Sequence, residues 1–346
     1  MDQISRIGMD TSKQIFQLHG VDAEERVVVR RRLRREEVLA YFADLAPTVV
    51  GIEACGGSHY WARELMRLGH EVRMMPPQYV KPYVKRGKHD AADAEALCEA
   101  MARPTMRFVA VKSEENQAAL MLAGTRDRLV RRRVQLGNTI RGHAAEFGLV
   151  AGKGRARIAP LLARIAGDAT LPPLARRLFA AYGEEYAALE TRLAVVDAEL
   201  RAWHRSNETS RRLAGIPGIG PVIASLLAMK TPDPHAFASA RHFAAWLGLT
   251  PKNHSTAGKN RLGVITRAGD EALRSLLVVG ATAVVSQARR GKGATPPWLA
   301  ELIKRKPPKL AAVALANKTA RIAWKLMASG ESYDAKRAPA GTTPAA

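Results

Sequence analysis

The 346-residue sequence is poor in cysteine, with only Cys55 and Cys98. Two cysteines exclude a disulfide framework and a cysteine-rich zinc site, and they suit a reducing compartment. No apolar run approaches the length of a membrane span, and the first residues lack the apolar core of a signal peptide. We therefore expect no membrane association, and a cytoplasmic protein of bacterial type that is associated with the nucleoid when it acts.

Acidic residues are also scarce: 32 Asp and Glu stand against 54 Lys and Arg, which gives a net charge of +22 and a pI of about 10.5. Such a balance predicts a polyanionic partner, and nucleic acid is the first candidate. An anionic membrane surface is the weaker alternative, because the arginines are scattered over several elements. Residues 1–110 hold 17 basic and 15 acidic residues, whereas residues 111–346 hold 37 and 17. This asymmetry predicts one module whose acidic residues take part in catalysis and another that binds phosphates.

The first third of the chain alternates short apolar runs with helical periodicity. The expected strands are residues 4–9, 14–21, 26–32, 48–52 and 71–75, and the expected helices are 35–45, 58–68 and one that begins at 90. The order β-β-β-α-β-α-β-α is that of a ribonuclease-H-like α/β domain.

Four acidic residues fall where such a fold carries out its chemistry. Asp90 and Asp93 share one face of an alanine-rich helix, because residues three apart are neighbours there. Asp10 ends the first strand and Glu53 the fourth. Each has a plain alternative: a solvated helix face for the aspartate pair, a turn or N-cap residue for Asp10, and a surface acid for Glu53. Their combined order favours a site for a divalent cation, Mg²⁺.

A long helix is expected from residue 114 to about residue 147. Its many arginines could line a solvated face, but we expect almost no acids to compensate them, which favours contact with a phosphate backbone. They are Arg126, Arg128, Arg131, Arg132, Arg133 and Arg141. A second helix carries apolar residues spaced alternately by four and three, which is a heptad seam. It predicts either a coiled coil with a partner helix, as in a dimer, or an intramolecular helical hairpin; its members are Tyr182, Tyr186, Leu189, Leu193, Val196, Leu200 and Trp203.

The segment L-A-G-I-P-G-I-G-P at 213–221 is typical of a helix-hairpin-helix module. In such a module, backbone N–H groups near Gly218 and Gly220 can hold a phosphate at the start of the following helix. A tight turn between packed helices would have the same glycines. Further helices are expected at 222–229, 237–247, 268–285 and 310–327, so that the second half is mainly α-helical.

A polar, glycine-punctuated segment at 248–263 interrupts these helices, and long irregular loops in compact domains are usually functional or disordered. It holds the adjacent hydroxyls of Ser255 and Thr256 among Lys252, Lys259 and Arg261. Cations beside a serine hydroxyl would hold a phosphodiester and favour the alkoxide form of the nucleophile. Plain phosphate binding by a basic loop is the alternative. The adjacent His254 is a weaker candidate for a base, because neighbouring side chains usually point apart.

Together these motifs resemble the insertion-sequence one-ten transposases, the bridge-RNA-guided recombinases. The resemblance covers nearly the whole chain. It rests on G-M-D-T-S-K at 8–13, G-I-E-A-C-G at 51–56, K-H-D-A-A-D-A at 88–94, I-P-G-I-G at 216–220, F-A-A-W-L-G-L-T-P at 243–251 and R-L-G-V-I-T-R-A-G-D at 261–270.

The resemblance implies a RuvC-like amino-terminal domain whose DEDD tetrad is Asp10, Glu53, Asp90 and Asp93, a coiled-coil link, and a carboxy-terminal transposase domain. It implies Ser255 as nucleophile, with Thr256 as competitor, and a tetrad and serine that come from different subunits. It also implies donor and target double-stranded DNA, a structured guide RNA, and a dimer or tetramer. A RuvC-like metal-dependent DNA junction nuclease, in which the serine segment only grips DNA, is the alternative.

The expected divisions are a catalytic domain at 1–110, a basic helical and coiled-coil region at 111–206, a transposase domain at 207–330 and a disordered tail at 331–346. The residues expected to contact nucleic acid are Lys13, Lys85, Arg86, Arg131, Arg132, Arg133, Gly218, Gly220, Lys252, Lys259 and Arg261.

Overall fold

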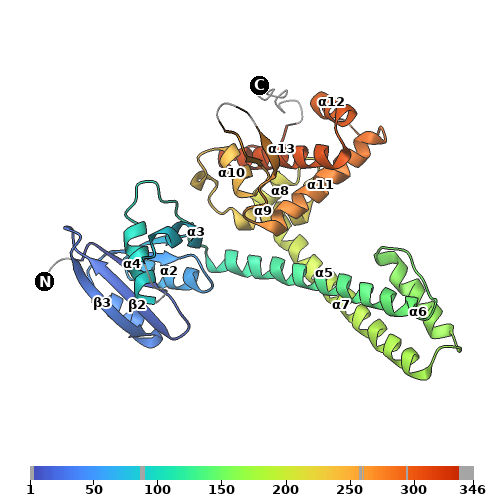
Figure 1. The fold of residues 1–346 in the computed structure, drawn as a ribbon, viewed down its shortest axis with the longest axis horizontal. Coiled ribbons are helices and arrows are strands. Elements are labelled where there is room, and N and C mark those ends of the chain that lie inside the picture. The colour runs from blue at the N-terminus through green and yellow to red at the C-terminus, as the bar shows by residue number, and fades with distance from the viewer. Residues whose placement is uncertain (1–3, 86–89, 257–258, 260, 294, 335–346) are drawn as a thin grey trace. The chain divides into compact units, whose positions relative to one another are not determined.

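Residues 4–85, 90–256, 259, 261–293 and 295–334 are described by the structure, which is a computed structural model of the chain (Figure 1). The predicted disordered tail lies outside these residues from residue 335 onward. The backbone contacts divide the chain into two units, Met1–Glu114 and Glu115–Ala346. Within the described residues, no helix combines the length and the apolar character needed to cross a membrane.

The first unit is a five-stranded sheet with helices on both faces, and its strand order is β3-β2-β1-β4-β5. β1 is antiparallel to β2, β2 is antiparallel to β3, and β4 and β5 are parallel to β1. The predicted order of strands and helices is confirmed, with a short α3 in addition. The elements are β1 (Arg6–Asp10), β2 (Ile15–Val21), β3 (Val27–Arg34), α1 (Val38–Ala43), β4 (Val49–Glu53), α2 (Ser58–Arg67), β5 (Glu71–Met75), α3 (Pro77–Val80) and α4 (Asp90–Ala100).

Alternation along β1 assigns its residues to the two faces of the sheet. Ile7 and Met9 are fully buried in a core with Phe42 of α1 and Trp61 of α2. Each such side chain contributes about 1.5–3 kcal/mol when it leaves water, so this face fixes the register of the strand. The intervening residues, including Asp10, therefore point to the opposite face, which α4 covers.

The second unit begins with three helices that pack on one another: α5 (Glu114–Ala145), α6 (Ile158–Gly167) and α7 (Pro173–Ser206). The heptad residues Tyr186, Leu189 and Leu193 are buried in one cluster with α5 residues such as Leu136 and Ile140. Of the two predicted arrangements, the structure thus contains the intramolecular hairpin. The buried seam positions are covered within the chain, and a contact with a partner helix stays a prediction.

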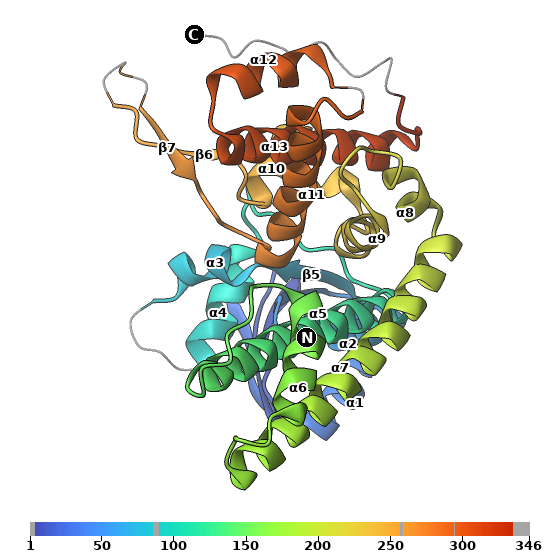
Figure 2. The same cartoon turned by 90° about the vertical axis from the view of Figure 1, so that its right-hand side faces the viewer.

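The rest of this unit is a helical bundle from which one β-hairpin extends (Figure 2). Its long central helices α11 and α13 pack together in a single apolar core. The helix α12 was not among the predicted helices. The elements are α8 (Glu208–Leu213), α9 (Pro221–Lys230), α10 (Ala240–Trp246), β6 (Pro251–Asn253), β7 (Leu262–Ile265), α11 (Glu271–Arg289), α12 (Pro297–Arg305) and α13 (Pro308–Ser329).

Candidate active site

Gly8 allows α4 to lie directly on β1. A Cβ atom at this position would be 2.1 Å from the carbonyl oxygen of Ala94 and 2.5 Å from the backbone nitrogen of Cys98, both in α4. No larger residue fits such an approach without moving the helix. Because Asp10 is two residues further along the same face of β1, the first turn of α4 lies above its carboxylate.

Three of the four predicted acids meet at this point. Carboxylate oxygens of Asp10, Asp90 and Asp93 lie within 4.8 Å of one another. The fourth, Glu53, ends β4, the parallel neighbour of β1, on the same face of the sheet. It lies outside that group of three, although it is near enough to influence the ionisation of Asp10.

The concentration of negative charge is visible in the pKa values. The pKa of Asp10 is raised from 3.8 to about 6. Burial is the largest cause, and repulsion by Asp93, Asp90 and Glu53 contributes to the same rise. Burial, followed by repulsion from Asp93, also raises the pKa of Glu53. Several carboxylates that disfavour each other's ionisation are stabilised together by a cation placed among them.

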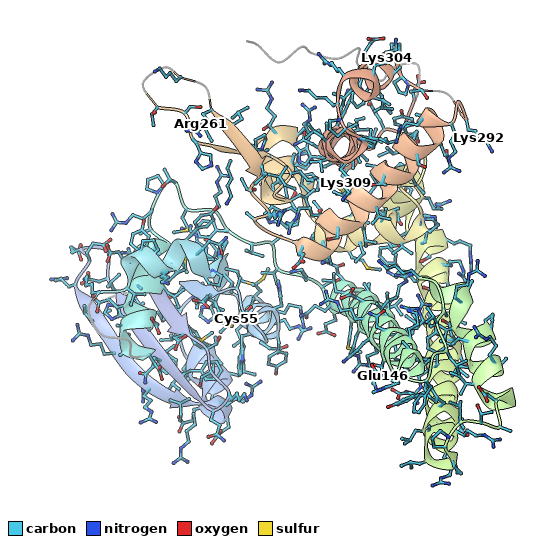
Figure 3. The ribbon with its side chains drawn as sticks, turned by 45° about the vertical axis from the view of Figure 1, so that its right-hand side comes forward. Cys55, Glu146, Arg261, Lys292, Lys304 and Lys309 are labelled. Atoms are coloured by element: carbon cyan, nitrogen blue, oxygen red, sulfur yellow. The ribbon has the colours of Figure 1, made fainter. Side chains whose placement is uncertain are left out.

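The donor atoms of this cluster are all oxygen, which suits a hard divalent cation. The two cysteines do not alter that donor set. Cys98 is buried on α4, and the exposed Cys55 lies near Thr11, with 3.4 Å between its Sγ and the threonine Oγ1 (Figure 3). The residues present therefore fit a divalent metal, and Asp10, Asp90 and Asp93 would be its nearest ligands.

The segment expected to be a long irregular loop contains the strand β6 and the start of β7, which pair as a hairpin, so the expectation is corrected for these strand residues. Ser255 lies two residues after the end of β6. Its backbone N–H donates to Oδ1 of Asn253 at 2.9 Å, and its Oγ accepts the backbone N–H of Arg261 at 3.0 Å. The Ser255 hydroxyl is therefore tied to the backbone of Arg261, a residue that Figure 3 labels.

The competing groups in the hairpin have different surroundings. Thr256 is exposed and pairs with Lys259 through the backbone, with 3.0 Å from the Lys259 nitrogen to the Thr256 oxygen. The ring of His254 lies over Gly263, where a Cβ would be 3.2 Å from its Nε2. The His254 ring thus packs against the paired strand β7.

Similarity to known proteins covers both regions. A family model described as transposase, of the DEDD IS110 type, matches residues 7–147, and the model described as "Transposase IS116/IS110/IS902 family" matches residues 210–295. A protein of Sinorhizobium fredii named as a transposase is 62% identical over 334 residues, which are 96% of this chain and 86% of the relative. The chain belongs to the IS110/IS116/IS902 family of transposases.

Two further transposases are similar over almost their whole length. The transposase of insertion sequence element IS1328 from Yersinia enterocolitica is 37% identical, over 96% of this chain and 99% of the relative. That of IS1111A from Coxiella burnetii is also 37% identical, over 96% and 92%. The protein is therefore an enzyme that acts on DNA, with a DEDD transposase region in its mixed α/β part and a helical second half.

The arginine triplet of the transposase's α5 is paired with acids of α7 and of α5 itself. Arg133, with only 18% of its side chain exposed, pairs with Glu190 at 3.2 Å, and Arg132 approaches Glu185 at 3.6 Å. Both acids belong to α7. Arg131 pairs with Asp127 one turn earlier at 3.0 Å. The premise that these arginines lack compensating acids was wrong, although their contact with phosphates stays a prediction.

The other basic residues predicted near the acids have different surroundings. Lys85 is paired with Glu95 of α4 at 2.7 Å, and this ion pair raises its pKa. Arg86 lies outside the described residues. Lys13 is exposed and lines a groove that also includes Asp90.

The turn between α8 and α9 contains the two glycines that were predicted to contact a phosphate, and their surroundings differ. Gly218 has φ +87° and faces α11, since a Cβ there would lie 3.0 Å from the carbonyl oxygen of Gly280. It serves helix packing. Gly220 precedes the first turn of α9 and has open space around it, so the predicted phosphate contact is sterically possible there.

Sequence reasoning missed two residues beside the acids, Gln17 of β2 and Arg32 of β3. They line one groove of about 910 Å³ with Lys13 and Asp90. The arginine run at 30–32 carried a signal, because alternation in a strand separates its members onto two faces.

Proposed function

We propose that this transposase excises and inserts a mobile element through a covalent protein–DNA intermediate formed by Ser255, assisted by Mg²⁺ at the acidic cluster of a RuvC-like domain. The observation that carries the proposal is the convergence of Asp10, Asp90 and Asp93 within 4.8 Å in a transposase of the DEDD type. The sheet order and the acids at strand ends support the ribonuclease-H-like assignment.

In this proposal the carboxylates of Asp10, Glu53, Asp90 and Asp93 hold the cation. Bound there, the metal would supply positive charge that polarises the scissile phosphate and stabilises the leaving oxygen. The raised pKa of Asp10 supports this role, because a carboxylate that resists ionisation by itself gains most from a neighbouring cation.

Ser255 is the proposed nucleophile because its hydroxyl is held by the backbone of Arg261, in a segment that also carries Lys252 and Lys259. Its Oγ loses a proton and forms a bond to phosphorus, while the bond from phosphorus to the leaving DNA oxygen breaks and that oxygen takes up a proton. A hydroxyl of the incoming strand then attacks the phosphoserine and restores Ser255. The number of phosphodiester bonds is conserved, so no outside energy source is required.

Exchange of two duplexes requires more than one subunit, so the proposal includes a dimer or tetramer. In accordance with the resemblance, serine and acids of one reaction come from different subunits, and a structured guide RNA selects donor and target DNA. The net charge of +22 supports a nucleic-acid partner, because basic residues neutralise its phosphates.

Covalent capture tests the nucleophile. Protein, Mg²⁺, guide RNA and cognate labelled DNA are incubated and denatured, and the protein-linked label is measured. We expect an adduct with the native protein and with Thr256→Val, and none with Ser255→Ala. An adduct lost in Thr256→Val but kept in Ser255→Ala would assign the nucleophile to Thr256.

The alternative is a metal-dependent junction nuclease, which needs no protein nucleophile. It predicts normal cleavage by Ser255→Ala and no adduct with the native protein, and that pair of results would replace the recombinase assignment. In either case Asp10→Ala and Asp93→Ala should abolish cleavage.

A further inference from the structure

A row of side chains crosses the sheet from the acidic cluster to its edge. In the register of the strands, Asp10 of β1 is opposite Gln17 of β2, and Gln17 is opposite Arg32 of β3. Paired residues in antiparallel strands point to the same face. With strands about 4.8 Å apart, the Cα of Arg32 is about 10 Å from that of Asp10. Arg34, two residues further along β3, shares this face.

An open groove connects these residues. Its walls include Lys13 in the turn after β1, Gln17, Arg32 and the exposed Asp90, and its volume is about 910 Å³. We call Lys13, Gln17, Arg32 and Arg34 the β3 basic surface. One end of the groove therefore reaches a member of the acidic cluster, and the other reaches the edge strand.

Arginines in and just after β3 lie on both faces of the sheet: Arg30, Arg32 and Arg34 share the face of Asp10, whereas Arg31 and Arg35 lie on the opposite face. Those of the opposite face stack on aromatic rings: Arg31 lies 5.1 Å from the ring centre of Tyr41 and Arg35, just after the strand, 4.9 Å from that of Trp61. Arg32 and Arg34 are exposed, and neither forms an ion pair with any acid among the described residues. Packing accounts for the first pair and leaves the second pair unexplained.

We infer that the β3 basic surface binds the phosphates of the DNA strand whose scissile bond lies at the acidic cluster. Along a strand, residues on one face repeat about every 6.7 Å, so Arg32 and Arg34 present two guanidinium groups in succession. Guanidinium groups bind phosphate oxygens in a bidentate manner, and Gln17 adds a neutral donor between them and the acids. Since the carboxylates repel a phosphate, cations beside them also offset that repulsion while a strand is bound.

The occupant is DNA because the strand that crosses the acids is the one that is cleaved, and this enzyme acts on DNA. This step depends on the proposed function. The guide RNA is the competing occupant, and it is an outcome of the test.

Photocrosslinking of the full-length protein tests the inference without any chemistry at the acids. DNA duplexes containing 4-thiothymidine are irradiated with the protein in EDTA, and the crosslinked peptides are identified by mass spectrometry. We expect crosslinks to residues of the turn after β1, of β2 and of β3. They should be lost in Arg32→Gln/Arg34→Gln and kept in Arg31→Gln/Arg35→Gln, which removes the same charge from the opposite face.

Salt dependence gives a second measurement on the same variants. Removal of two phosphate contacts should lower the slope of log affinity against log salt concentration by about 1.4–1.8. The variant Arg32→Lys/Arg34→Lys should restore the slope, because lysine keeps the charge, and circular dichroism confirms that each variant is folded.

Two results would overturn the inference: equal loss of crosslinks in both arginine pairs, or preferential crosslinking of a 4-thiouridine RNA of the same sequence at these peptides. Asp10→Asn/Asp93→Asn separates this inference from the proposed function. Crosslinks in EDTA should persist in that variant, whereas strand transfer in Mg²⁺ should be lost; transfer that persists would contradict the proposed function and not the DNA contact.

Discussion

Removal of one carboxylate from the acidic cluster should make the metal-free protein more stable. Asp10 has a pKa raised from 3.8 to about 6, so its ionised form is less favourable in the folded protein than in the unfolded chain. The unfavourable contribution is absent well below pH 3.8, where the carboxyl is protonated in both states. It grows between about pH 4 and about pH 6 and is complete above that range. Asp10→Asn removes the charge and keeps the shape.

The size of the effect follows from the shift. About two pKa units correspond to at most about 3 kcal/mol, and because the side chain is partly exposed we expect about half of that, about 1.5 kcal/mol. Hydrogen–deuterium exchange of the intact protein in EDTA measures this change in stability for individual peptides. At pH 7.5, and after correction for intrinsic rates, peptides of β1 and α4 in Asp10→Asn should exchange about tenfold more slowly than in the native protein.

The pH and the metal provide the controls. At pH 5 the slowing should be markedly smaller, roughly threefold to fivefold, because Asp10 is largely protonated there. Added Mg²⁺ at 100 times its dissociation constant should protect the native protein by about 2.7 kcal/mol and the variant much less. Asp44→Asn, at an exposed position after α1 in the same unit, should change neither. If Asp10→Asn exchanged like the native protein at pH 7.5, or slowed equally at both pH values, the electrostatic reasoning would be refuted.

Three further substitutions test packing, each by thermal unfolding of the full chain. Gly8→Ala should lower stability by about 1–3 kcal/mol and weaken metal-induced stabilisation, because α4 must move away from β1, whereas Gly56→Ala, with open space around it, should do neither. Leu193→Ala should cost about 3–5 kcal/mol if the seam is covered within the chain, and Val195→Ala, at an exposed position of the same helix, less than 1 kcal/mol. Arg274→Met should cost about 3 kcal/mol, since it leaves two carbonyl oxygens at the foot of the β6–β7 hairpin without their buried donor; a loss below 1 kcal/mol would show that they find other partners.

The sheet and the positions of its acids were predictable because their signals are local. Ile7 and Met9 alternate with residues of the other face, and Asp10 and Glu53 stand where apolar runs end. The sequence could not show that Glu53 lies outside the closest group of three. That depends on side-chain distances across two strands and a helix, which no spacing along the chain determines.

The remaining differences come from contacts between distant residues and from short exposed elements. The arginines of α5 meet Glu185 and Glu190, which are more than 50 residues further along, so composition of the helix alone indicated too little compensation. The strands β6 and β7 have three and four residues and are almost wholly exposed. Without a buried face they have no apolar alternation, and the hairpin was therefore expected to be an irregular loop.

The acidic cluster is held together by apolar packing. Ala96 and Leu97 of α4 are buried in a cluster with Met75 of β5, and Gly8 lets the helix approach β1 to the limit of contact. Their burial offsets the repulsion that raises the pKa of Asp10. A cation entering such a site relieves existing repulsion without first having to gather its ligands, which favours a preformed site. The free energy that ordering the carboxylates would otherwise cost then remains available for binding, so the close contact of α4 with β1 at Gly8 favours cation binding by the acids.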